Sequence, residues 1–223
     1  MCGRFSLTAS AQTIVDVFGI EDLPDYVPCY NIAPTTQILG IRMENGQRVA
    51  RPFRWGLIPF WAKDIKIGYK LLNARSETVH QKPSFKAAFS QRRILVVTDG
   101  FYEWQRDGKE KKAYYFQSPT KQPFAIAGLW ERWFDLDGTE IQSATLLTTT
   151  ANETMQPFHH RMPVLLPPER WDAWIDANTP GLRLGPEFLA PAPNETLIPT
   201  RVSTYVNNVR NQGPECIEPL KID

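Results

Sequence analysis

The sequence predicts an α+β fold: a single domain in which a mainly antiparallel β-sheet curls into a barrel-like core with a few flanking helices. Three turn signals support this prediction, because Asn45-Gly46, Asp107-Gly108 and Asp137-Gly138 each separate two strand-like segments, as in β-hairpins. Helical spacing of apolar residues is confined to short segments. The 223 residues can bury one large core without disulfides, so we expect one domain over residues 1–223.

The first helix is expected after Thr8 and Ser10, either of which can cap it, and before Gly19, a residue type that commonly ends helices. Its apolar residues share one face: Ile14, Val15 and Phe18. Two further helices are expected over 84–89 and 168–177. The apolar face of the second favours burial in the core over a functional role: Trp171, Trp174 and Ile175.

The strands follow from the hairpin turns. The hairpins are expected to pair 38–43 with 48–55, 101–105 with 113–116, and 124–134 with 141–149. The β-branched segment 94–97 is typical of a buried strand, and strand-like sequence returns over 198–206. The segment 179–200 is rich in proline and lacks periodicity, so we expect an ordered loop that crosses the sheet.

Composition excludes several classes of protein. Hydrophobic residues make up 42% of the chain and aromatic residues 12%, too many for a disordered protein. No apolar run approaches the ~18–20 residues of a membrane span, and the N-terminus lacks the pattern of a signal peptide. Cys2, Cys29 and Cys216 are too few and too scattered for a disulfide framework or a cysteine-rich zinc site. We therefore expect a soluble, monomeric protein of the reducing cytoplasm, without membrane contact, bound metal or cofactor.

The net charge of +1 conceals an uneven distribution of charge along the chain. Residues 42–112 hold 16 Lys and Arg against 7 Asp and Glu, a local charge of +9. The remainder holds 9 against 17, a charge of −8. Such a block is explained either by an ordinary solvated surface or by an interface for nucleic acid.

The N-terminus reads Met1-Cys2-Gly3-Arg4 and can supply two nucleophiles. A small second residue permits removal of the initiator methionine, which would leave Cys2 with a free α-amino group and a thiol. Their reference pKa values of ~7.7–8.0 and ~8.5 make both nucleophilic near neutral pH. The pair suits an aldehyde, because the amine forms a Schiff base and the thiol closes a five-membered thiazolidine ring. Taken alone, Cys2 is equally explained as an incidental small residue.

Aromatic residues lie among basic ones in the segment Arg54-Trp55-Gly56-Leu57-Ile58-Pro59-Phe60-Trp61. In single-stranded nucleic acid, bases stack on such rings and cations meet phosphates. Trp55, Pro59 and Trp61 are therefore candidate DNA contacts, with core packing as the alternative. The polar segment Asn73-Ala74-Arg75-Ser76-Glu77-Thr78 follows and reads by itself as a helix start or a turn.

Two further segments carry titratable groups. Glu103 stands among aromatic residues in Phe101-Tyr102-Glu103-Trp104, where desolvation would raise a carboxyl pKa and suit general acid–base chemistry. An outward-facing glutamate on a strand is the alternative. His159-His160-Arg161-Met162-Pro163 combines histidines that can shuttle protons with an arginine that can hold a phosphate. Neighbouring histidines rarely converge on one ion, so no metal site is expected there.

In this order, the segments around Cys2, Trp55, Asn73, Glu103 and His159 resemble the SRAP family, the SOS response-associated peptidases, which shield abasic sites in DNA. The resemblance extends from Cys2 to about Pro219 and includes a closing motif, Asn208-Val209-Arg210-Asn211-Gln212-Gly213. It implies that Cys2, after loss of Met1, forms a thiazolidine crosslink with the aldehyde of an abasic site in single-stranded DNA. It also implies binding at single-strand–duplex junctions, lyase-type Schiff-base chemistry, and self-removal of Met1 as the peptidase reaction.

The resemblance implies a role for each candidate residue. Cys2 would be the nucleophile, Asn73 would orient the reacting terminus, and Glu103 and His159 would be acid–base groups. His160 would then occupy a variable position of the motif. The implied DNA contacts bind phosphates or form a wedge beside the lesion: Arg4, Arg75, Arg161, Trp55, Pro59 and Trp61.

Two other classes of function remain open. Some N-terminal-nucleophile amidohydrolases and glutamine amidotransferases also begin Met-Cys-Gly, although this chain has no extended glutamine-site pattern. A non-catalytic single-stranded DNA-binding module would bind intact and abasic DNA equally, with Cys2 incidental. The full set of motifs favours covalent capture of abasic DNA.

Overall fold

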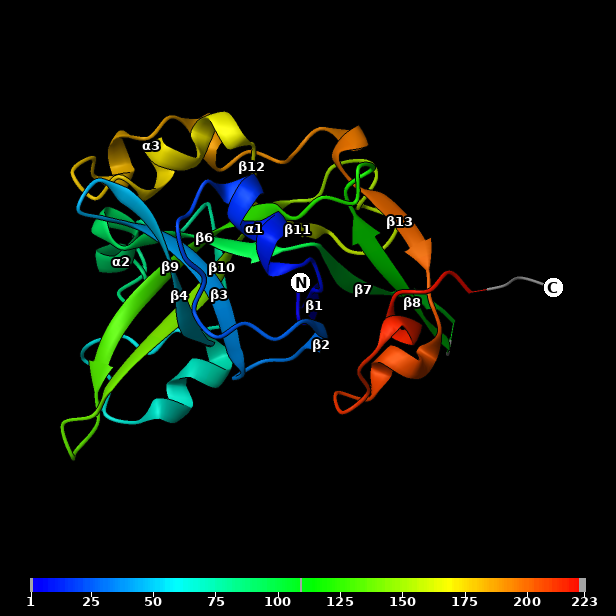
Figure 1. The fold of residues 1–223 in the computed structure, drawn as a ribbon, viewed down its shortest axis with the longest axis horizontal. Coiled ribbons are helices and arrows are strands. Elements are labelled where there is room, and N and C mark those ends of the chain that lie inside the picture. The colour runs from blue at the N-terminus through cyan, green and yellow to red at the C-terminus, as the bar shows by residue number, and fades with distance from the viewer. Residues whose placement is uncertain (1, 109, 221–223) are drawn as a thin grey trace.

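The structure, a computed structural model, describes residues 2–108 and 110–220, and a five-stranded barrel closes within it (Figure 1). Around this barrel run β10 (Glu140–Thr150), β4 (Gln47–Trp55), β3 (Gln37–Glu44), β6 (Arg93–Thr98) and β9 (Phe124–Phe134). Strand β9 pairs again with β10 and so closes the ring. The β10–β4 pairing is parallel, and the other pairings around the barrel are antiparallel.

A second, antiparallel sheet stands beside the barrel (Figure 1). Its strand order is β13 (Ile198–Arg201), β8 (Glu110–Gln117), β7 (Gly100–Asp107), β1 (Phe5–Leu7) and β2 (Cys29–Ile32). Strand β6 passes into β7 through Asp99, so one stretch of chain serves both sheets. Short strands extend the barrel sheet: β5 (Asn73–Arg75) and β11 (Arg161–Pro163) pair with β10, and β12 (Leu165–Leu166) pairs with β9.

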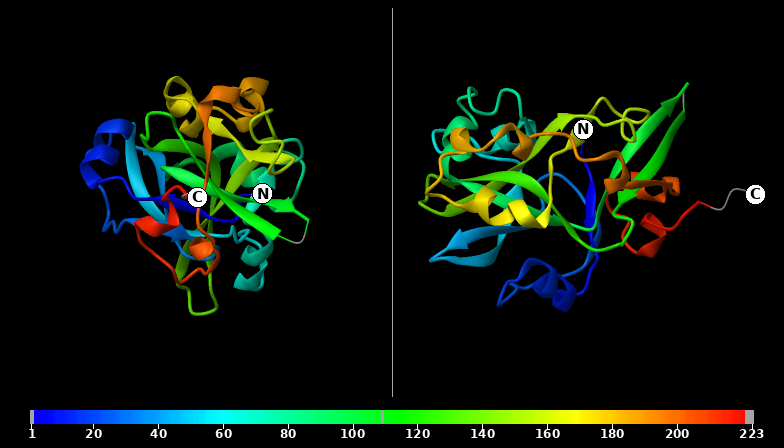
Figure 2. Two further views of the ribbon diagram at one scale, coloured as in Figure 1. Left: turned by 90° about the vertical axis from the view of Figure 1, so that its right-hand side faces the viewer. Right: turned by 90° about the horizontal axis from the view of Figure 1, so that it is seen from above.

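Short helices flank the two sheets and do not form a continuous layer (Figure 2). The α-helices are α1 (Ala11–Phe18), α2 (Lys86–Gln91) and α3 (Trp171–Ile175). The 3-10 helices are η1 (Ile65–Lys70), η2 (Pro168–Arg170), η3 (Gly181–Arg183), η4 (Pro186–Phe188), η5 (Asn194–Thr196), η6 (Thr204–Asn207) and η7 (Pro214–Cys216). Within the described residues, every helix is too short or too polar to cross a bilayer.

The predicted fold class is confirmed, and the hairpins form where the turn signals place them. In the β3–β4 turn, Asn45 and Gly46 have φ angles of 50° and 81°, as a type I′ hairpin turn requires. Helix α1 begins at Ser10, whose side chain accepts a hydrogen bond from the Thr13 N–H at 3.1 Å. It ends at Gly19, which is left-handed with a φ of 60°.

Several sequence-based expectations differ from the structure. The helix expected over 168–177 divides into η2 and the short α3, and the helix expected over 84–89 is α2, shifted by two residues. The strand expected over 198–206 ends at Arg201, because Ser203 accepts a hydrogen bond from Tyr205 N–H and caps η6. The segment that begins at Asn73 forms strand β5, and the predicted turn starts only at Ser76. Pairing with β10 supplies the backbone partners that make this segment a strand.

A main hydrophobic core fills the barrel and extends beneath α1 and α3. Trp171 and Trp174 are buried in it, as the spacing predicted, and Phe18 stacks on Trp171 with 4.6 Å between ring centroids. A smaller core lies between the second sheet and the C-terminal segment, and Tyr102 and Val206 belong to it. The two cores hold the second sheet between the barrel and the end of the chain.

A buried polar cluster fixes β1, the strand that follows Cys2. The Asp99 carboxylate accepts hydrogen bonds from Ser6 Oγ at 2.5 Å, from Thr8 Oγ1 at 2.7 Å and from Ala9 N–H at 2.9 Å. The Thr8 N–H also donates to it. Hydrogen bonds to a charged group contribute about 1.5–3 kcal/mol each, so Asp99 is a principal anchor of this strand.

An Asp99→Asn variant should lower the free energy of unfolding by at least about 2 kcal/mol. The amide keeps the shape of the carboxylate but loses its charge and turns an N–H group toward donors. Urea denaturation measures the change, with the exposed Asp137→Asn as a control that should shift stability by less than about 0.5 kcal/mol. Equal stability of the two variants would show that Asp99 is not an anchor.

Candidate active site

Cys2 lies immediately before strand β1 and is only 1% exposed. Its carbonyl oxygen accepts a hydrogen bond from Asn73 Nδ2 at 2.9 Å. Because Asn73 belongs to β5, which pairs with β10, this bond ties the N-terminal segment to the barrel sheet. The second polar atom of the amide, Asn73 Oδ1, is buried without a hydrogen-bond partner in the described part of the chain.

Glu103 lies on β7, the strand that pairs with β1, and its side chain is buried. The neighbouring Tyr102 N–H donates to Arg4 O at 3.0 Å, which continues this pairing toward the N-terminus. Burial raises the pKa of the Cys2 thiol, and the Glu103 carboxylate raises it further, because a thiolate would place two negative charges together. The outward-facing alternative for Glu103 is therefore wrong.

His159 lies in the loop before β11 and is half-buried. Its Nδ1 accepts a hydrogen bond from Arg161 N–H at 2.9 Å, so the neutral ring carries its proton on Nε2. Burial lowers the pKa of His159, while the Glu103 carboxylate acts in the opposite direction. The adjacent His160 is exposed and stacks on His159 with 4.3 Å between ring centroids. The ring that interacts with the buried carboxylate is thus His159.

The loop that carries His159 is anchored to the second sheet by aromatic contacts. Phe158 packs edge to face against Tyr114 and Phe116, with ring centroids 4.6 and 5.0 Å apart. Tyr114 is the cross-strand partner of Glu103 in the β7–β8 register. Phe158 therefore fixes the histidine loop over the same pair of strands that carries the carboxylate.

The structure brings the four residues predicted to be catalytic into one electrostatic and hydrogen-bonded cluster: Cys2, Asn73, Glu103 and His159. They come from the N-terminus, β5, β7 and the β10–β11 loop. The cluster combines a thiol with a carboxylate that can take up or release a proton and an imidazole that can donate one. Among residues 2–108 and 110–220, no group of His, Cys, Asp and Glu has an arrangement that could hold a metal ion.

Arg161, predicted to contact DNA, is instead bound within the protein. Its Nη1 and Nη2 donate to Glu77 Oε1 and Oε2 at 2.5 and 2.9 Å, and Nη2 also donates to Thr148 O at 2.6 Å. Its side chain is buried and its charge is paired with Glu77, so the predicted phosphate contact is corrected, although its Nε has no hydrogen-bond partner in the described part of the chain. The ion pair instead links the segment after β5 to β11, and so connects the surroundings of Asn73 and His159.

Trp55 and Pro59, two of the predicted DNA contacts, are buried. The Trp55 indole packs edge to face on Phe5, with 5.0 Å between ring centroids, and its Nε1 donates to Leu72 O at 3.0 Å. A side chain without exposed surface cannot stack on a base, so both assignments are corrected. Trp55 instead joins the barrel core to strand β1.

Exposed aromatic residues lie directly beyond these buried ones. Trp61, the third predicted contact of this segment, is 47% exposed, and its neighbour Phe60 is 60% exposed. Tyr69, on η1, is 59% exposed and lies under the guanidinium of Arg54 at 5.6 Å. The sequence reasoning missed Phe60 and Tyr69, although the basic and aromatic composition around them was a usable signal.

The basic block does not form one continuous positive face, which corrects that interpretation. Part of it is neutralised in the described structure by ion pairs: Arg42 and Arg51 with Glu44, Arg48 with Asp172, and Arg92 with Glu131. Arg93 is buried and donates to backbone carbonyl groups. Six other exposed cations of the block belong to the segment from Trp61 to α2: Lys63, Lys66, Lys70, Arg75, Lys82 and Lys86. Arg106 and Lys111 are exposed on the β7–β8 hairpin.

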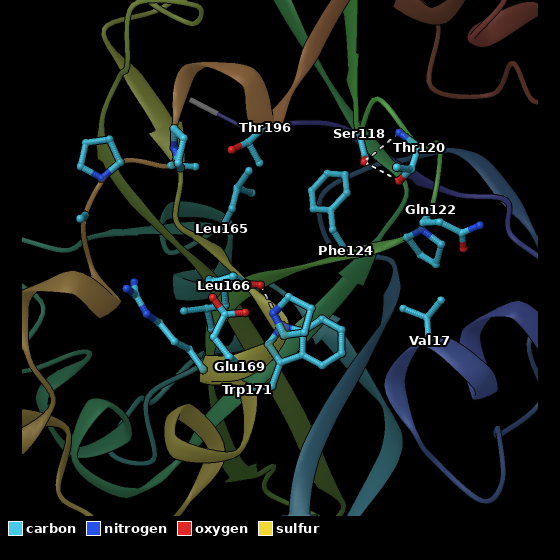
Figure 3. A pocket seen from close by; sticks show the side chains of 18 of the residues that line it. Val17, Ser118, Thr120, Gln122, Phe124, Leu165, Leu166, Glu169, Trp171 and Thr196 are labelled. Carbon is cyan, nitrogen blue, oxygen red and sulfur yellow. Dashed lines mark hydrogen bonds between the residues drawn. The ribbon is translucent and has the colours of Figure 1, made fainter.

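A cavity of about 920 Å³ lies apart from this cluster, between β12, the N-terminal end of β9 and the proline-rich segment after η4 (Figure 3). Its wall includes Phe124, Leu165 and Leu166, and Trp171 Nε1 donates to Leu166 O at 2.8 Å. None of the predicted site residues lines it. The candidate active site is therefore identified by the side chains that surround Cys2 and not by this cavity.

The raised pKa of the Cys2 thiol predicts an unusual pH dependence for its alkylation. An ordinary cysteine with a pKa of ~8.5 reaches its maximal rate above about pH 9.5, because the thiolate is the reacting form. The rate at Cys2 should instead keep rising from pH 7 to pH 10 without levelling. Mass spectrometry of the N-terminal peptide after timed iodoacetamide treatment measures this, and a plateau near pH 9 would contradict the effect of burial and Glu103.

The barrel, the second sheet and a thiol–carboxylate–imidazole cluster around Cys2 define a class of β-barrel protein with a candidate nucleophile at its second residue. A family model described as SOS response associated peptidase (SRAP) matches residues 1–209. The chain belongs to this family, as the motifs of the sequence indicated.

Similar proteins of known name and structure extend this assignment. The chain is 39% identical over 222 residues to the abasic site processing protein YoqW of Bacillus subtilis, covering 98% of this chain and 99% of that protein. It is 33% identical to the abasic site processing protein HMCES of Xenopus tropicalis, covering 99% of this chain and 78% of that one. A crystal structure of a Bordetella bronchiseptica protein is 27% identical with a TM-score of 0.79, covering 91% and 100%. One from Bacteroides thetaiotaomicron, 24% identical, shares the fold with a TM-score of 0.85, covering 99% and 100%.

Proposed function

We propose that the protein captures abasic sites in single-stranded DNA by forming a thiazolidine crosslink at Cys2 after removal of Met1. The observation that carries the proposal is that Cys2, Glu103 and His159 lie on adjoining elements: Glu103 is on β7, which pairs with β1 beside Cys2, and Phe158 packs the His159 loop against Tyr114, the cross-strand partner of Glu103. The similarity to the abasic site processing proteins YoqW and HMCES supports an abasic-site processing role. The product would shield the lesion during the response to DNA damage.

The proposed reaction begins with hydrolysis of the Met1–Cys2 peptide bond, which consumes one water and frees the α-amino group. The amine adds to the aldehyde carbon of the ring-opened deoxyribose, and loss of water gives a Schiff base. The Cys2 sulfur then adds to the imine carbon, and its proton passes to the nitrogen as the five-membered ring closes. Glu103 can accept and return these protons, and the Nε2–H of His159 can donate to the departing oxygen. Asn73 holds the Cys2 carbonyl and so orients the amine.

The surroundings of this cluster suit a DNA strand. Arg4 and Arg75 are accessible to phosphates, and the exposed rings of Phe60 and Trp61 suit stacking of bases beside the lesion. Binding at a single-strand–duplex junction, action as a monomer and self-removal of Met1 are further parts of the proposal. Each follows from the family resemblance.

A denaturing gel tests the proposal directly. The purified protein, shown by mass measurement to have lost Met1, is mixed with an oligonucleotide containing one abasic site and with the matched intact oligonucleotide. We expect a shifted, heat-stable band with the abasic strand alone. Absence of this band from protein that lacks Met1 would exclude covalent capture, and equal affinity for the two strands would favour a simple DNA-binding module.

A Trp61→Ala variant should weaken binding to intact single-stranded DNA by about 1–3 kcal/mol, the contribution of one base stacked on an aromatic ring. Fluorescence anisotropy with a labelled oligonucleotide measures the affinity. Trp55→Phe is the matched control, because Trp55 is buried: it should lower stability through loss of the bond to Leu72 O and leave DNA affinity unchanged. A loss of affinity in the control alone would reverse the assignment of these two residues.

A further inference from the structure

Arg4, two residues from Cys2, is held from one side only. Its Nη1 donates to Asn31 Oδ1 at 2.6 Å and to Val206 O at 3.1 Å. Its guanidinium carbon lies 5.7 Å from the centroid of the Trp104 ring. Within residues 2–108 and 110–220, its Nε and Nη2 make no hydrogen bond. Since a guanidinium carries five donors in a planar fork, one edge of Arg4 stays available for an anion.

Asn31 connects this arginine to the end of the chain. It lies on β2, is 2% exposed, and its Nδ2 donates to three carbonyl oxygens at 3.0–3.1 Å: Val206, Asn208 and Asn211. One buried amide thus accepts from Arg4 through its oxygen and fastens residues 203–217 through its nitrogen. We call residues 203–217 the C-terminal clamp.

The C-terminal clamp is fastened to the second sheet at further points. Gln212 Oε1 accepts a hydrogen bond from Tyr30 N–H at 3.0 Å, beside Asn31 on β2. Trp104, whose ring lies under the Arg4 guanidinium, donates from Nε1 to Asn207 Oδ1 at 2.7 Å. The clamp is therefore fastened to β2 and to β7, the two strands that carry the Arg4 partners Asn31 and Trp104.

We propose that Asn31 and the C-terminal clamp are positioning elements that set the Arg4 guanidinium to bind a DNA phosphate next to Cys2. This inference rests on the proposed function, since it assigns the phosphate partner of the same site. A long, flexible side chain loses rotamer entropy when it binds an anion, and fixing it beforehand removes that loss. The Arg4 carbonyl also accepts from the Cys2 thiol at 3.8 Å, so the fixed arginine and the reacting sulfur share one short stretch of backbone.

Non-covalent DNA binding tests the inference separately from the crosslinking chemistry. In a Cys2→Ala background, the affinity for intact single-stranded DNA is measured over a range of salt concentrations. Arg4→Ala should reduce the slope of log affinity against log salt by about 0.7, the value for one phosphate on a single strand. Asn31→Ala should weaken binding at least threefold, and the Arg4→Ala/Asn31→Ala double variant should bind within twofold of Arg4→Ala alone.

Tyr26→Phe is the matched control. It removes the hydrogen bonds of the Tyr26 hydroxyl to Leu7 O and Ala9 O at the far end of β1, and it should leave affinity and salt slope unchanged. If Asn31→Ala does not fold, Gln212→Ala loosens the clamp at an exposed position and should weaken binding in the same way. Additive effects of Arg4→Ala and Asn31→Ala, or an unchanged affinity in Asn31→Ala, would overturn the inference. Failure of the unsubstituted protein to form an adduct would contradict the proposed function. The combined effect of Arg4→Ala and Asn31→Ala on the affinity for intact DNA could still be measured.

Discussion

A Cys2→Ala variant should form no stable adduct with abasic single-stranded DNA, whereas the unsubstituted protein should convert most of the strand. Alanine at position 2 still permits removal of Met1, so the variant retains the α-amino group but lacks the thiol. The amine alone can form a Schiff base, but without sulfur the five-membered ring cannot close. The expected products on a denaturing gel are therefore unmodified DNA and cleaved strands in place of the shifted band.

Cys29→Ala provides the matched control for this experiment. Cys29 lies on β2 and is half-buried, and its Sγ donates to Gln212 Oε1 of the C-terminal clamp at 3.4 Å. The comparison is therefore made at saturating DNA, where the substitution removes a thiol of the same chain without changing the four predicted catalytic residues. Its adduct yield should equal that of the unsubstituted protein. If Cys2→Ala still formed a heat-stable adduct and Cys29→Ala did not, the reacting cysteine would be Cys29, and the proposed role of Cys2 would be wrong.

A Glu103→Gln variant should crosslink abasic DNA about 100-fold more slowly at saturating DNA, because a positioned acid–base group contributes about 10²–10⁴-fold. Glutamine fills the same buried space on β7, so the affinity for intact DNA should change by less than threefold. Single-turnover crosslinking rates, compared with anisotropy measurements of affinity, separate the two effects.

The same variant should react faster with iodoacetamide at Cys2, because removing the Glu103 carboxylate lowers the thiol pKa. Unfolding would also expose Cys2 and speed its alkylation, so the nearly unchanged affinity for intact DNA distinguishes loss of the Glu103 carboxylate from unfolding. Glu140→Gln is the control at an exposed glutamate of β10, and it should leave both rates unchanged. An unchanged crosslinking rate in Glu103→Gln would remove this residue from the mechanism.

Much of the fold could be predicted because its signals are local. The Asn-Gly and Asp-Gly turns select hairpins through backbone conformations that the next few residues impose. Ser10 and Gly19 mark the ends of α1 for the same reason. Strand β5 was harder to predict, because three residues that begin at Asn73 become a strand only by pairing with β10, where the partner of Asn73 is Leu146.

The candidate site also contains residues that could be predicted from the sequence and residues that could not. Cys2 and Glu103 could be chosen as candidates from residue type and neighbours, and in the structure the Glu103 carboxylate acts on the Cys2 thiol. The aromatic segment was ambiguous, because composition does not determine which of two tryptophans faces the core: Trp55 is buried and Trp61 is exposed. Arg161 looked suited to a phosphate, but Glu77 reaches it from a segment 84 residues away in sequence.

The sequence by itself determined the family, the hairpin framework and the candidate nucleophile of the proposed reaction, Cys2. These depend on residue identity and on contacts within a few positions. The tertiary structure alone decided which cations remain accessible, that His159 rather than His160 interacts with the carboxylate, and that Asn31 holds Arg4 against the end of the chain. Each of these depends on burial and on partners that strand pairing brings together. The order of residues along the chain does not show which distant residue will neutralise a charge or accept a hydrogen bond.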